Sequence, residues 1–337
     1  MKKLWLLGVL ALLLSIGTTT PTTAQLSDNP VITSENVTQI VQLGILGHDK
    51  VREAIFSPDG NTLIIVIQNN ILLYDVNNLD KEPQSLFVQD ITTIDYSPDG
   101  QSIVAGFRNG AVHILDVDTV ETKQAFHEDI EPISVVAYSP NGGFIGTGSN
   151  EGTVRVLDIS TNTELYYQIG VRFTPVTALK FSPDGKSLAF GYWRGNDIYI
   201  FDVQTGTRQH HFIQNTLGIW NIVYSPDGKF ITSTTNNNRL EPIEINIWDI
   251  EQELLVQSFE GHTSAIIDID YSPDGQLIVS GSIDQTLRIW DVAIGIELRT
   301  LIGHSDIVSN VDFSPDGRFI VSGSSDGTIR IWGIPQN

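Results

Sequence analysis

A four-residue turn signal recurs seven times along this chain of 337 residues. It reads Ser-Pro-Asp-Gly, with Asn141 replacing Asp in the third copy, and the copies occupy 57–60, 97–100, 139–142, 182–185, 225–228, 272–275 and 314–317. Their spacings are 40, 42, 43, 43, 47 and 42 residues. A period of this length indicates a repeated supersecondary unit that buries its apolar face against its neighbours.

Each turn lies among four runs of alternating apolar and polar residues. The unit around Ser272 contains 266–271 before the turn and 277–280, 287–291 and 297–301 after it. Such alternation is typical of half-buried strands. Four strands in each of seven units predict an all-β fold, a seven-bladed β-propeller of four-stranded antiparallel blades spanning 40–337.

The turn residues are explained by backbone geometry. Proline presets the first central φ angle, Asp suits the second position, and Gly tolerates a positive φ at the exit. We therefore interpret the repeated tetrapeptide as a hairpin turn between the first two strands of each blade, and not as a metal-binding or catalytic loop.

The beginning of the chain has the order of a secretory signal peptide. Lys2 and Lys3 are followed by an apolar run over 4–16 and a small, polar stretch that ends at Ala24. Thirteen apolar residues would span about 20 Å as a helix, against a hydrocarbon core of about 30 Å. We expect residues 1–24 to be a signal peptide cleaved after Ala24, and an uncleaved anchor is the alternative. The mature protein is then exported, extracellular or periplasmic, and has no stable membrane insertion.

Residues 25–39 are expected to be an N-terminal linker, and 40–46 a closing strand. The chain ends just after the third strand of its last unit, and the pattern of 40–48 repeats that of 297–304. The N-terminal segment should therefore supply the missing fourth strand and cover the open edge of the last blade.

Charge and cysteine content restrict the partners. The formal net charge is −21 and there is no Cys. A phosphate backbone repels such a surface, so we expect no nucleic acid partner, and a basic protein is the electrostatically favoured one. The lack of Cys excludes disulfides and thiolate sites. We expect a monomeric domain without metal or cofactor.

The repeats resemble the WD-repeat family, in a secreted, bacterial-type form. The family's glycine-histidine start is present at Gly47-His48, Gly261-His262 and Gly303-His304, and its name dipeptide at Trp248-Asp249 and Trp290-Asp291. The resemblance extends over 40–334. The unit from Phe181 to Asp202 also looks like the repeat of the periplasmic propeller of the Tol-Pal system, but the glycine-histidine and Trp-Asp pairs favour WD repeats.

The resemblance implies a hydrogen-bonded set of four side chains in each blade. Two blades have all four members, namely His262, Ser280, Asp284 and Trp290, and His304, Ser322, Asp326 and Trp332. The other blades are incomplete, with Asn109, Glu151 or Phe190 at one of these positions. We interpret both sets as structural, because a nucleophile site would not be duplicated in two separate sheets.

Departures from the repeat mark the candidate binding site. The connections after the second strand are unusual in the fourth and fifth blades, and Trp220 and Arg52 replace small or aliphatic residues of the innermost strand. Trp and Arg are enriched in binding hot spots. The candidate partner-binding residues are Arg52, Trp193, Arg194, Trp220 and Arg239. The alternative interpretation is that Trp193 is buried and the longer connection has no function.

These observations predict a non-catalytic scaffold for protein–protein interaction. The alternative is a small-ligand or glycan-binding propeller that uses Trp193 and Trp220 as stacking platforms. A propeller hydrolase is the least favoured: the segment 324–328 looks like a sialidase box but places Gly one residue too early. His210 and His211 are poor metal ligands, because adjacent strand residues point to opposite faces.

Overall fold

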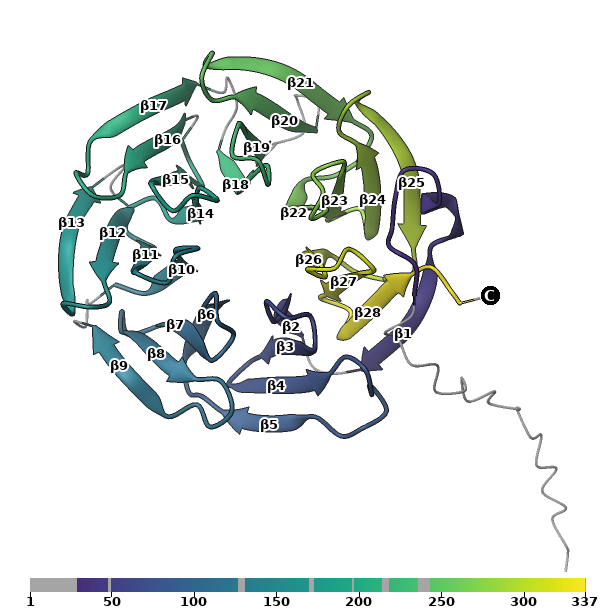
Figure 1. The fold of residues 1–337 in the computed structure, drawn as a ribbon, viewed down its shortest axis with the longest axis horizontal. Helices are drawn as coiled ribbons and strands as arrows, with labels where there is room; N and C mark the ends of the chain where they lie inside the picture. The colour runs from purple at the N-terminus through teal and green to yellow at the C-terminus, as the bar shows by residue number, and fades with distance from the viewer. Residues whose placement is uncertain are drawn as a thin grey trace, which may run out of the picture.

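Seven four-stranded antiparallel sheets form a closed ring in the computed structural model of the chain (Figure 1). The structure describes residues 29–47, 50–126, 131–169, 173–195, 197–213, 218–235 and 243–336. The predicted seven-bladed β-propeller is confirmed. Among the described residues, no helix combines the length and the apolar character that crossing a bilayer requires.

Blades 1 to 6 are each built from four consecutive strands, and the innermost strand comes first in the chain. Blades 1 to 3 contain β2 (Val51–Phe56), β3 (Thr62–Ile67), β4 (Asn70–Asp75) and β5 (Gln84–Phe87); β6 (Ile91–Tyr96), β7 (Ser102–Phe107), β8 (Val112–Asp116) and β9 (Thr122–Phe126); and β10 (Ile133–Tyr138), β11 (Phe144–Ser149), β12 (Thr153–Asp158) and β13 (Thr163–Ile169). Blades 4 to 6 contain β14 (Val176–Phe181), β15 (Ser187–Tyr192), β16 (Asp197–Asp202) and β17 (Arg208–Ile213); β18 (Ile219–Tyr224), β19 (Phe230–Thr235), β20 (Glu244–Asp249) and β21 (Leu254–Glu260); and β22 (Ile266–Tyr271), β23 (Leu277–Ser282), β24 (Thr286–Asp291) and β25 (Ile296–Ile302). Blade 7 combines β26 (Val308–Phe313), β27 (Phe319–Ser324) and β28 (Thr328–Gly333) with β1 (Val41–Gly47).

The repeated tetrapeptide forms the turn between the first and second strand of every blade. In blade 1 the Ser57 hydroxyl donates to Asp59 (2.5 Å) and accepts the N–H of Thr62 (2.9 Å). Gly60 has a φ of 72°, where a side chain is unfavourable, and its N–H donates to the Ser57 carbonyl. The hairpin interpretation is therefore confirmed in its hydrogen bonds.

The seven turns also contact one another around one face of the ring. Pro58 lies beside Gly100 of the next turn, and Pro315 of the last turn lies beside Gly60 of the first. The other five boundaries repeat this Pro–Gly contact. The tetrapeptide thus serves the turn within a blade and the packing between blades. We call this face, which also carries the connections between third and fourth strands, the turn face.

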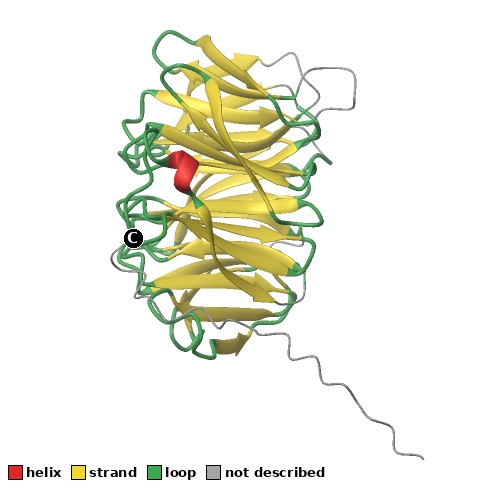
Figure 2. Cartoon of the chain, turned by 90° about the vertical axis from the view of Figure 1, so that its right-hand side faces the viewer, coloured by secondary structure: helices red, strands yellow, loops and turns green. Residues whose placement is uncertain are grey.

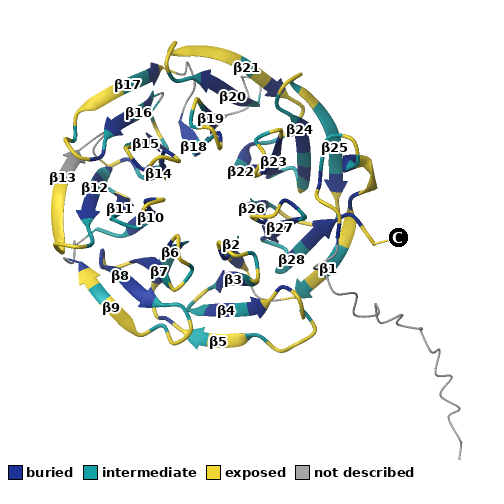
Figure 3. Cartoon of the chain, in the orientation of Figure 1, coloured by how far each residue is buried: buried dark blue, intermediate teal, exposed yellow. Residues whose placement is uncertain are grey.

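The hydrophobic core is divided among the blade boundaries. Seven clusters of buried residues are present, and each joins two neighbouring blades, as Leu63 of blade 1 joins Ile331 of blade 7. Inner and third strands are mostly buried, whereas β5, β9, β17 and β21 on the rim are exposed (Figure 3). Each blade is therefore stable only against its neighbours.

The N-terminal segment closes the ring as predicted. Strand β1 pairs antiparallel with β28, from Val41 opposite Gly333 to Gly47 opposite Thr328. A short 3₁₀ helix, η2 (Val37–Gln39), precedes β1 and lies on the outside of the disc (Figure 2). The predicted signal peptide, 1–24, lies outside the described residues.

Residues 29–39, which we expected to be a linker, pack against the seam. Ile32, Val37 and Ile40 are at most 1% exposed and join the cluster between blades 6 and 7. The Ile32 N–H donates to the Gly317 carbonyl (2.9 Å), and the Asn29 amide donates to that of Ile334 (2.8 Å). This part of the N-terminal segment therefore belongs to the core.

Candidate functional site

Trp193 and Trp220 lie at one corner of the face opposite the turn face. We call this the loop face, because it carries the connections between second and third strands. The Trp193 N–H donates to the Pro175 carbonyl (3.0 Å), and the guanidinium of Arg194 lies 4.9 Å from the centre of the Trp193 ring. Gly218 packs on the Trp193 carbonyl, where a Cβ would overlap the oxygen. Both Trp side chains are half-buried, and Arg194 is exposed.

Not all predicted site residues share this corner. Arg52 is exposed on β2 in blade 1, and at least two blades separate it from Trp193 in blade 4 and from Trp220 in blade 5. Arg239 lies outside the described residues. The described part of the predicted site thus consists of Trp193, Arg194 and Trp220, with Arg52 apart.

Arg52 occupies a position that ties neighbouring blades together. At three blade boundaries, the side chain of the second residue in an innermost strand donates to a backbone carbonyl in the following blade. That carbonyl belongs to the first residue of the following blade's innermost strand. The pairs are Arg52 with Ile91 (3.3 Å), Ser134 with Val176 (2.7 Å) and Thr177 with Ile219 (2.5 Å). Arg52 therefore has a structural contact that the sequence did not suggest. The Trp220 indole N–H is buried and has no partner among the described residues.

The four-residue set of blade 6 forms a continuous hydrogen-bonded chain. The Trp290 indole N–H donates to Ser280 Oγ (2.8 Å), which lies 2.7 Å from His262 Nε2, and His262 Nδ1 lies 2.8 Å from Asp284. The ionised Asp284 carboxylate can only accept, so Nδ1–H donates to it, and in that tautomer Nε2 accepts from the Ser280 hydroxyl. Although burial opposes ionisation, hydrogen bonds from His262 and Thr286 hold the pKa of Asp284 below its ordinary value.

Blade 7 repeats this chain with nearly the same distances. Trp332 donates to Ser322 (2.9 Å), His304 Nε2 lies 2.8 Å from Ser322, and His304 Nδ1 lies 3.1 Å from Asp326. Burial lowers the pKa of His304, which favours the neutral ring. Ser322 is fully buried, as is Ser280 in blade 6, so neither hydroxyl is accessible to a substrate.

Blade 4 replaces this chain with aromatic packing. Phe190, at the hydroxyl position, is 2% exposed and stacks on Tyr199 at 5.6 Å between ring centres. His211 stacks on the other side of Tyr199 at 4.9 Å, whereas His210 contacts Glu253 of blade 5 (2.9 Å). The two His side chains therefore serve different contacts.

The central channel contains charged residues that the sequence reasoning missed. A cavity of about 180 Å³ is lined by the innermost strands of all seven blades. Five carboxylates accept a backbone N–H from the next innermost strand: Glu53 from Ile94, Asp95 from Tyr138, Asp268 from Val311, Asp270 from Phe313 and Asp312 from Phe56, at 2.7–2.8 Å. These N–H groups face the channel and have no strand beside them, so the carboxylates satisfy them.

Burial makes these carboxylates costly to ionise. It raises the pKa of Glu53 and of Asp268 to about 7 and that of Asp270 to about 6. Lys180 of β14 offsets part of the negative charge of these carboxylates. Burial alone would lower the pKa of Lys180, but the charges of Asp95 and Asp268 raise it above its ordinary value. Among the described residues, no group of three or more His, Asp or Glu is arranged to hold a metal ion.

A sequence signal for this ring does exist. Asp95, Asp270 and Asp312 stand immediately before the aromatic residue that precedes the Ser-Pro turn, and Lys180 has the same position in blade 4. The alternation of strand residues points this position away from the apolar clusters. This position identifies Asp95, Lys180, Asp270 and Asp312, whereas Glu53 and Asp268 stand three residues before the aromatic residue of their blades and escape it.

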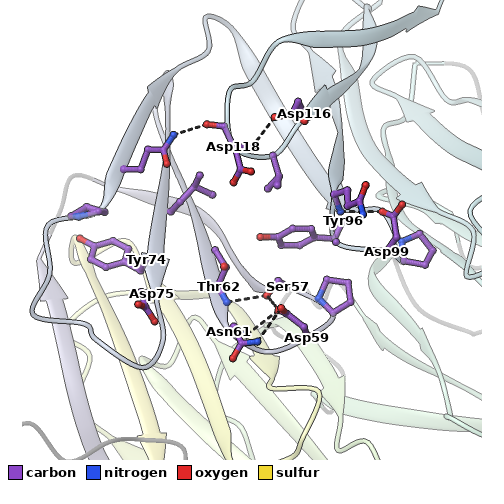
Figure 4. A pocket seen from close by; sticks show the side chains of 18 of the residues that line it. Ser57, Asp59, Asn61, Thr62, Tyr74, Asp75, Tyr96, Asp99, Asp116 and Asp118 are labelled. Atoms are coloured by element: carbon purple, nitrogen blue, oxygen red, sulfur yellow. Dashed lines mark hydrogen bonds between the residues drawn. The ribbon is translucent and has the colours of Figure 1, made fainter.

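Within the described part of the chain, two pockets open on the turn face at blade boundaries. The larger, of about 990 Å³, lies between blades 1 and 2 and is lined by both turns and by both connections between third and fourth strands (Figure 4). The smaller, of about 560 Å³, lies between blades 4 and 5. Sequence reasoning missed both, because it considered only the departures on the loop face.

Comparison with known protein families agrees with this architecture. Residues 253–291 and 295–333 match the WD40 model, described as WD domain, G-beta repeat. Residues 12–172 match the model described as Eukaryotic translation initiation factor eIF2A. No curated protein matches the chain.

Each WD40 match begins near the outer strand of one blade and ends with the third strand of the next. The repeat is therefore offset from the blade by one strand, and β1 supplies the strand that this offset leaves missing in blade 7. The chain is a seven-bladed β-propeller that carries WD40 repeats, which end in blades 6 and 7.

Proposed function

We propose that this chain is an exported, non-catalytic scaffold that binds a protein partner through the Trp193–Arg194–Trp220 corner of its loop face. The observation that supports the proposal is the presence of WD40 repeats on a closed propeller, which is commonly a scaffold for protein interaction. The corner adds exposed Arg194, held beside Trp193, in a place where the repeat is broken. Trp and Arg are the residue types that dominate binding hot spots.

Two other functions have less support. A glycan stacks on an open aromatic face, but Arg194 already lies over the Trp193 ring. The eIF2A match names a translation factor, and a net charge of −21 disfavours contact with RNA.

The binding proposal is tested by capture of a partner. Mature protein starting at Gln25 is used as bait in an envelope or culture-supernatant extract, and retained proteins are identified by mass spectrometry. Arg194→Ala should weaken retention of the specific partner by about 2 kcal/mol, roughly thirtyfold. Arg208→Ala is the matched control, because Arg208 is exposed on β17 of the same blade. Equal retention by both variants would place the binding surface elsewhere.

Arg239 and the salt dependence of binding complete this test. Arg239→Ala should weaken the same partner if the longer connection of blade 5 takes part in the contact. A basic partner should also associate faster at low salt, because the chain is strongly acidic. An association rate that does not change with salt would contradict a basic partner.

Export is tested separately. The order of residues 1–24 supports cleavage after Ala24. Intact-mass analysis and N-terminal sequencing of the protein from the host's medium or periplasm should find a chain that begins at Gln25. A soluble cytoplasmic protein that begins at Met1 would contradict the proposal.

A further inference from the structure

The pocket between blades 1 and 2 contains a buried hydroxyl group without a partner. The Tyr96 side chain is 7% exposed, and its hydroxyl makes no hydrogen bond with any described residue. Figure 4 shows the Tyr96 ring pointing into the pocket, with Asp118 and Asp59 on either side. Buried polar groups are nearly always hydrogen-bonded, so this hydroxyl requires an explanation.

The blade repeat provides an internal comparison. Tyr271 has the same place at the boundary between blades 5 and 6, and its hydroxyl lies 2.6 Å from Thr232 Oγ1. The strand register puts Ile64 of blade 1 where blade 5 has Thr232. Tyr96 therefore lacks a partner because blade 1 offers a methyl-bearing side chain instead of a hydroxyl.

The pocket is strongly acidic. Its lining includes six carboxylates, those of Asp59, Asp75, Glu82, Asp99, Asp116 and Asp118, against Lys81 and Lys123. Lys123 is already engaged, since it contacts Asp116 (2.9 Å) and donates to the Gln101 carbonyl (2.9 Å). Most of the negative charge is therefore not neutralised within the pocket.

Two of these carboxylates act on the Tyr96 hydroxyl. Burial first, and then the charges of Asp59 and Asp118, raise the pKa of Tyr96, so the hydroxyl stays protonated. Asp59 belongs to the turn of blade 1 and Asp118 to the loop after β8 of blade 2. Hydrogen bonds from Ser57 and Asn61 hold the pKa of Asp59 below its usual value. The neutral Tyr96 hydroxyl, which can accept a hydrogen bond, thus lies between the carboxylates of Asp59 and Asp118 on opposite walls of the pocket.

We propose that this pocket binds the guanidinium or ammonium group of an Arg or Lys side chain presented by an extended peptide segment of a partner. The Tyr96 hydroxyl accepts a hydrogen bond from the cationic group, and Asp59 and Asp118 pair with its charge. A volume of about 990 Å³ accommodates a segment of chain and far exceeds a single ion. The site lies on the turn face, so it is independent of the Trp193 corner and is tested independently.

The first test uses defined peptides on the mature protein. Blocked Gly-Gly-X-Gly-Gly peptides with Arg, Lys or citrulline at X are titrated by calorimetry, with tyrosine NMR signals recorded in parallel. The Arg and Lys peptides should bind at least tenfold more tightly than the citrulline peptide and should shift the Tyr96 signal, which Tyr96→Phe identifies. Equal binding of the Arg and citrulline peptides, or no binding, would overturn the proposal.

Variants locate the site. Asp118→Asn should weaken the Arg peptide at least tenfold. Glu251→Gln is the matched control, because Glu251 is exposed in the corresponding loop of blade 5 on the same face and its loss removes the same charge. Tyr96→Phe should weaken binding about fivefold without lowering the melting temperature, since the hydroxyl bonds none of the described residues. Equal effects of Asp118→Asn and Glu251→Gln would show unspecific attraction and overturn the site.

Spermidine distinguishes a small polycation from a peptide. If spermidine binds at least tenfold more tightly than the Arg peptide, and Asp118→Asn abolishes this, the peptide assignment is overturned. If the peptides bind more tightly, the assignment is supported. Loss of partner capture in the Arg194→Ala experiment leaves this result unaffected, so the two proposals fail separately.

Discussion

Ser322 shows how one small residue organises a whole blade. Its hydroxyl lies between the Trp332 indole N–H (2.9 Å) and His304 Nε2 (2.8 Å), and it is fully buried. Both neighbours depend on it for their hydrogen bond, and the His ring in turn orients toward Asp326. Blade 4 shows the other solution, in which Phe190 removes the hydroxyl and the neighbouring rings pack without it.

Ser322→Ala should therefore lower the free energy of unfolding by about 3 kcal/mol, because two buried polar groups lose their partner at once. Denaturant unfolding of the mature protein measures this. Ser305→Ala is the control in the same blade, since Ser305 is exposed and donates its backbone N–H to Asp326, a bond that Ala retains. A change in Ser322→Ala no larger than in the control would show that the chain of hydrogen bonds does not stabilise the blade.

At the scale of elements, the seam of the ring depends on the N-terminal segment. Strand β1 covers the edge of β28 that the chain would otherwise leave open, and 29–40 fill a groove between blades 6 and 7. The closure thus joins the two ends of the chain, and Arg330 of β28 bonds Gln42 of β1. An open edge would also be a site for pairing with another chain.

A chain that begins at residue 48 should unfold at a lower denaturant concentration than one that begins at Asn29. Ile32, Val37 and Ile40 are fully buried, and their loss alone corresponds to roughly 5 kcal/mol of unfolding free energy. The chain that begins at Asn29 is the control and should match the mature protein. Similar midpoints for the two shortened chains would contradict closure by β1.

At the scale of the molecule, the channel carboxylates and the four-residue sets respond to pH in opposite directions. The channel groups have raised pKa values, which reach about 7 for Glu53 and Asp268. They bind protons more readily in the folded than in the unfolded state. Asp284 and Asp326 have lowered pKa values and must stay ionised. The channel therefore stabilises the ring increasingly as the pH falls through 7, and the four-residue sets lose their contribution in strong acid.

The free energy of unfolding should thus rise from pH 8 to about pH 5 and fall below about pH 4. Urea unfolding across this range measures it. Glu53→Gln should reduce the slope between pH 8 and 5, because one raised pKa is removed. Asp75→Asn, at the exposed end of β4, is the control for the loss of one carboxylate outside the channel. Stability that increases steadily from pH 5 to 8 would contradict the assignment.

The number of blades and the turns were predictable because their causes are local, and the closing strand because 40–48 repeats the pattern of 297–304 where the last unit lacks a fourth strand. Pro and Gly restrict φ within four residues, and alternation identifies a strand within six, so seven copies of the pattern already imply seven sheets. The four-residue sets followed from the resemblance of the repeats. The packing of 29–39 was not predictable, because the contact between Ile32 and the seam joins positions nearly 300 residues apart.

The channel charges and the pocket at Tyr96 depended on the ring as a whole. Glu53 meets Ile94 and Tyr96 faces Asp59 only because neighbouring blades converge on one axis, which brings residues about one repeat apart into contact. Tyr96 and Tyr271 have the same local sequence, Asp-Tyr-Ser-Pro-Asp-Gly, yet the Tyr271 hydroxyl contacts Thr232 and the Tyr96 hydroxyl bonds none of the residues described in the structure. The difference lies in the preceding blade, which offers Thr232 to Tyr271 but Ile64 to Tyr96. Closure of the ring brings those side chains beside the two Tyr residues.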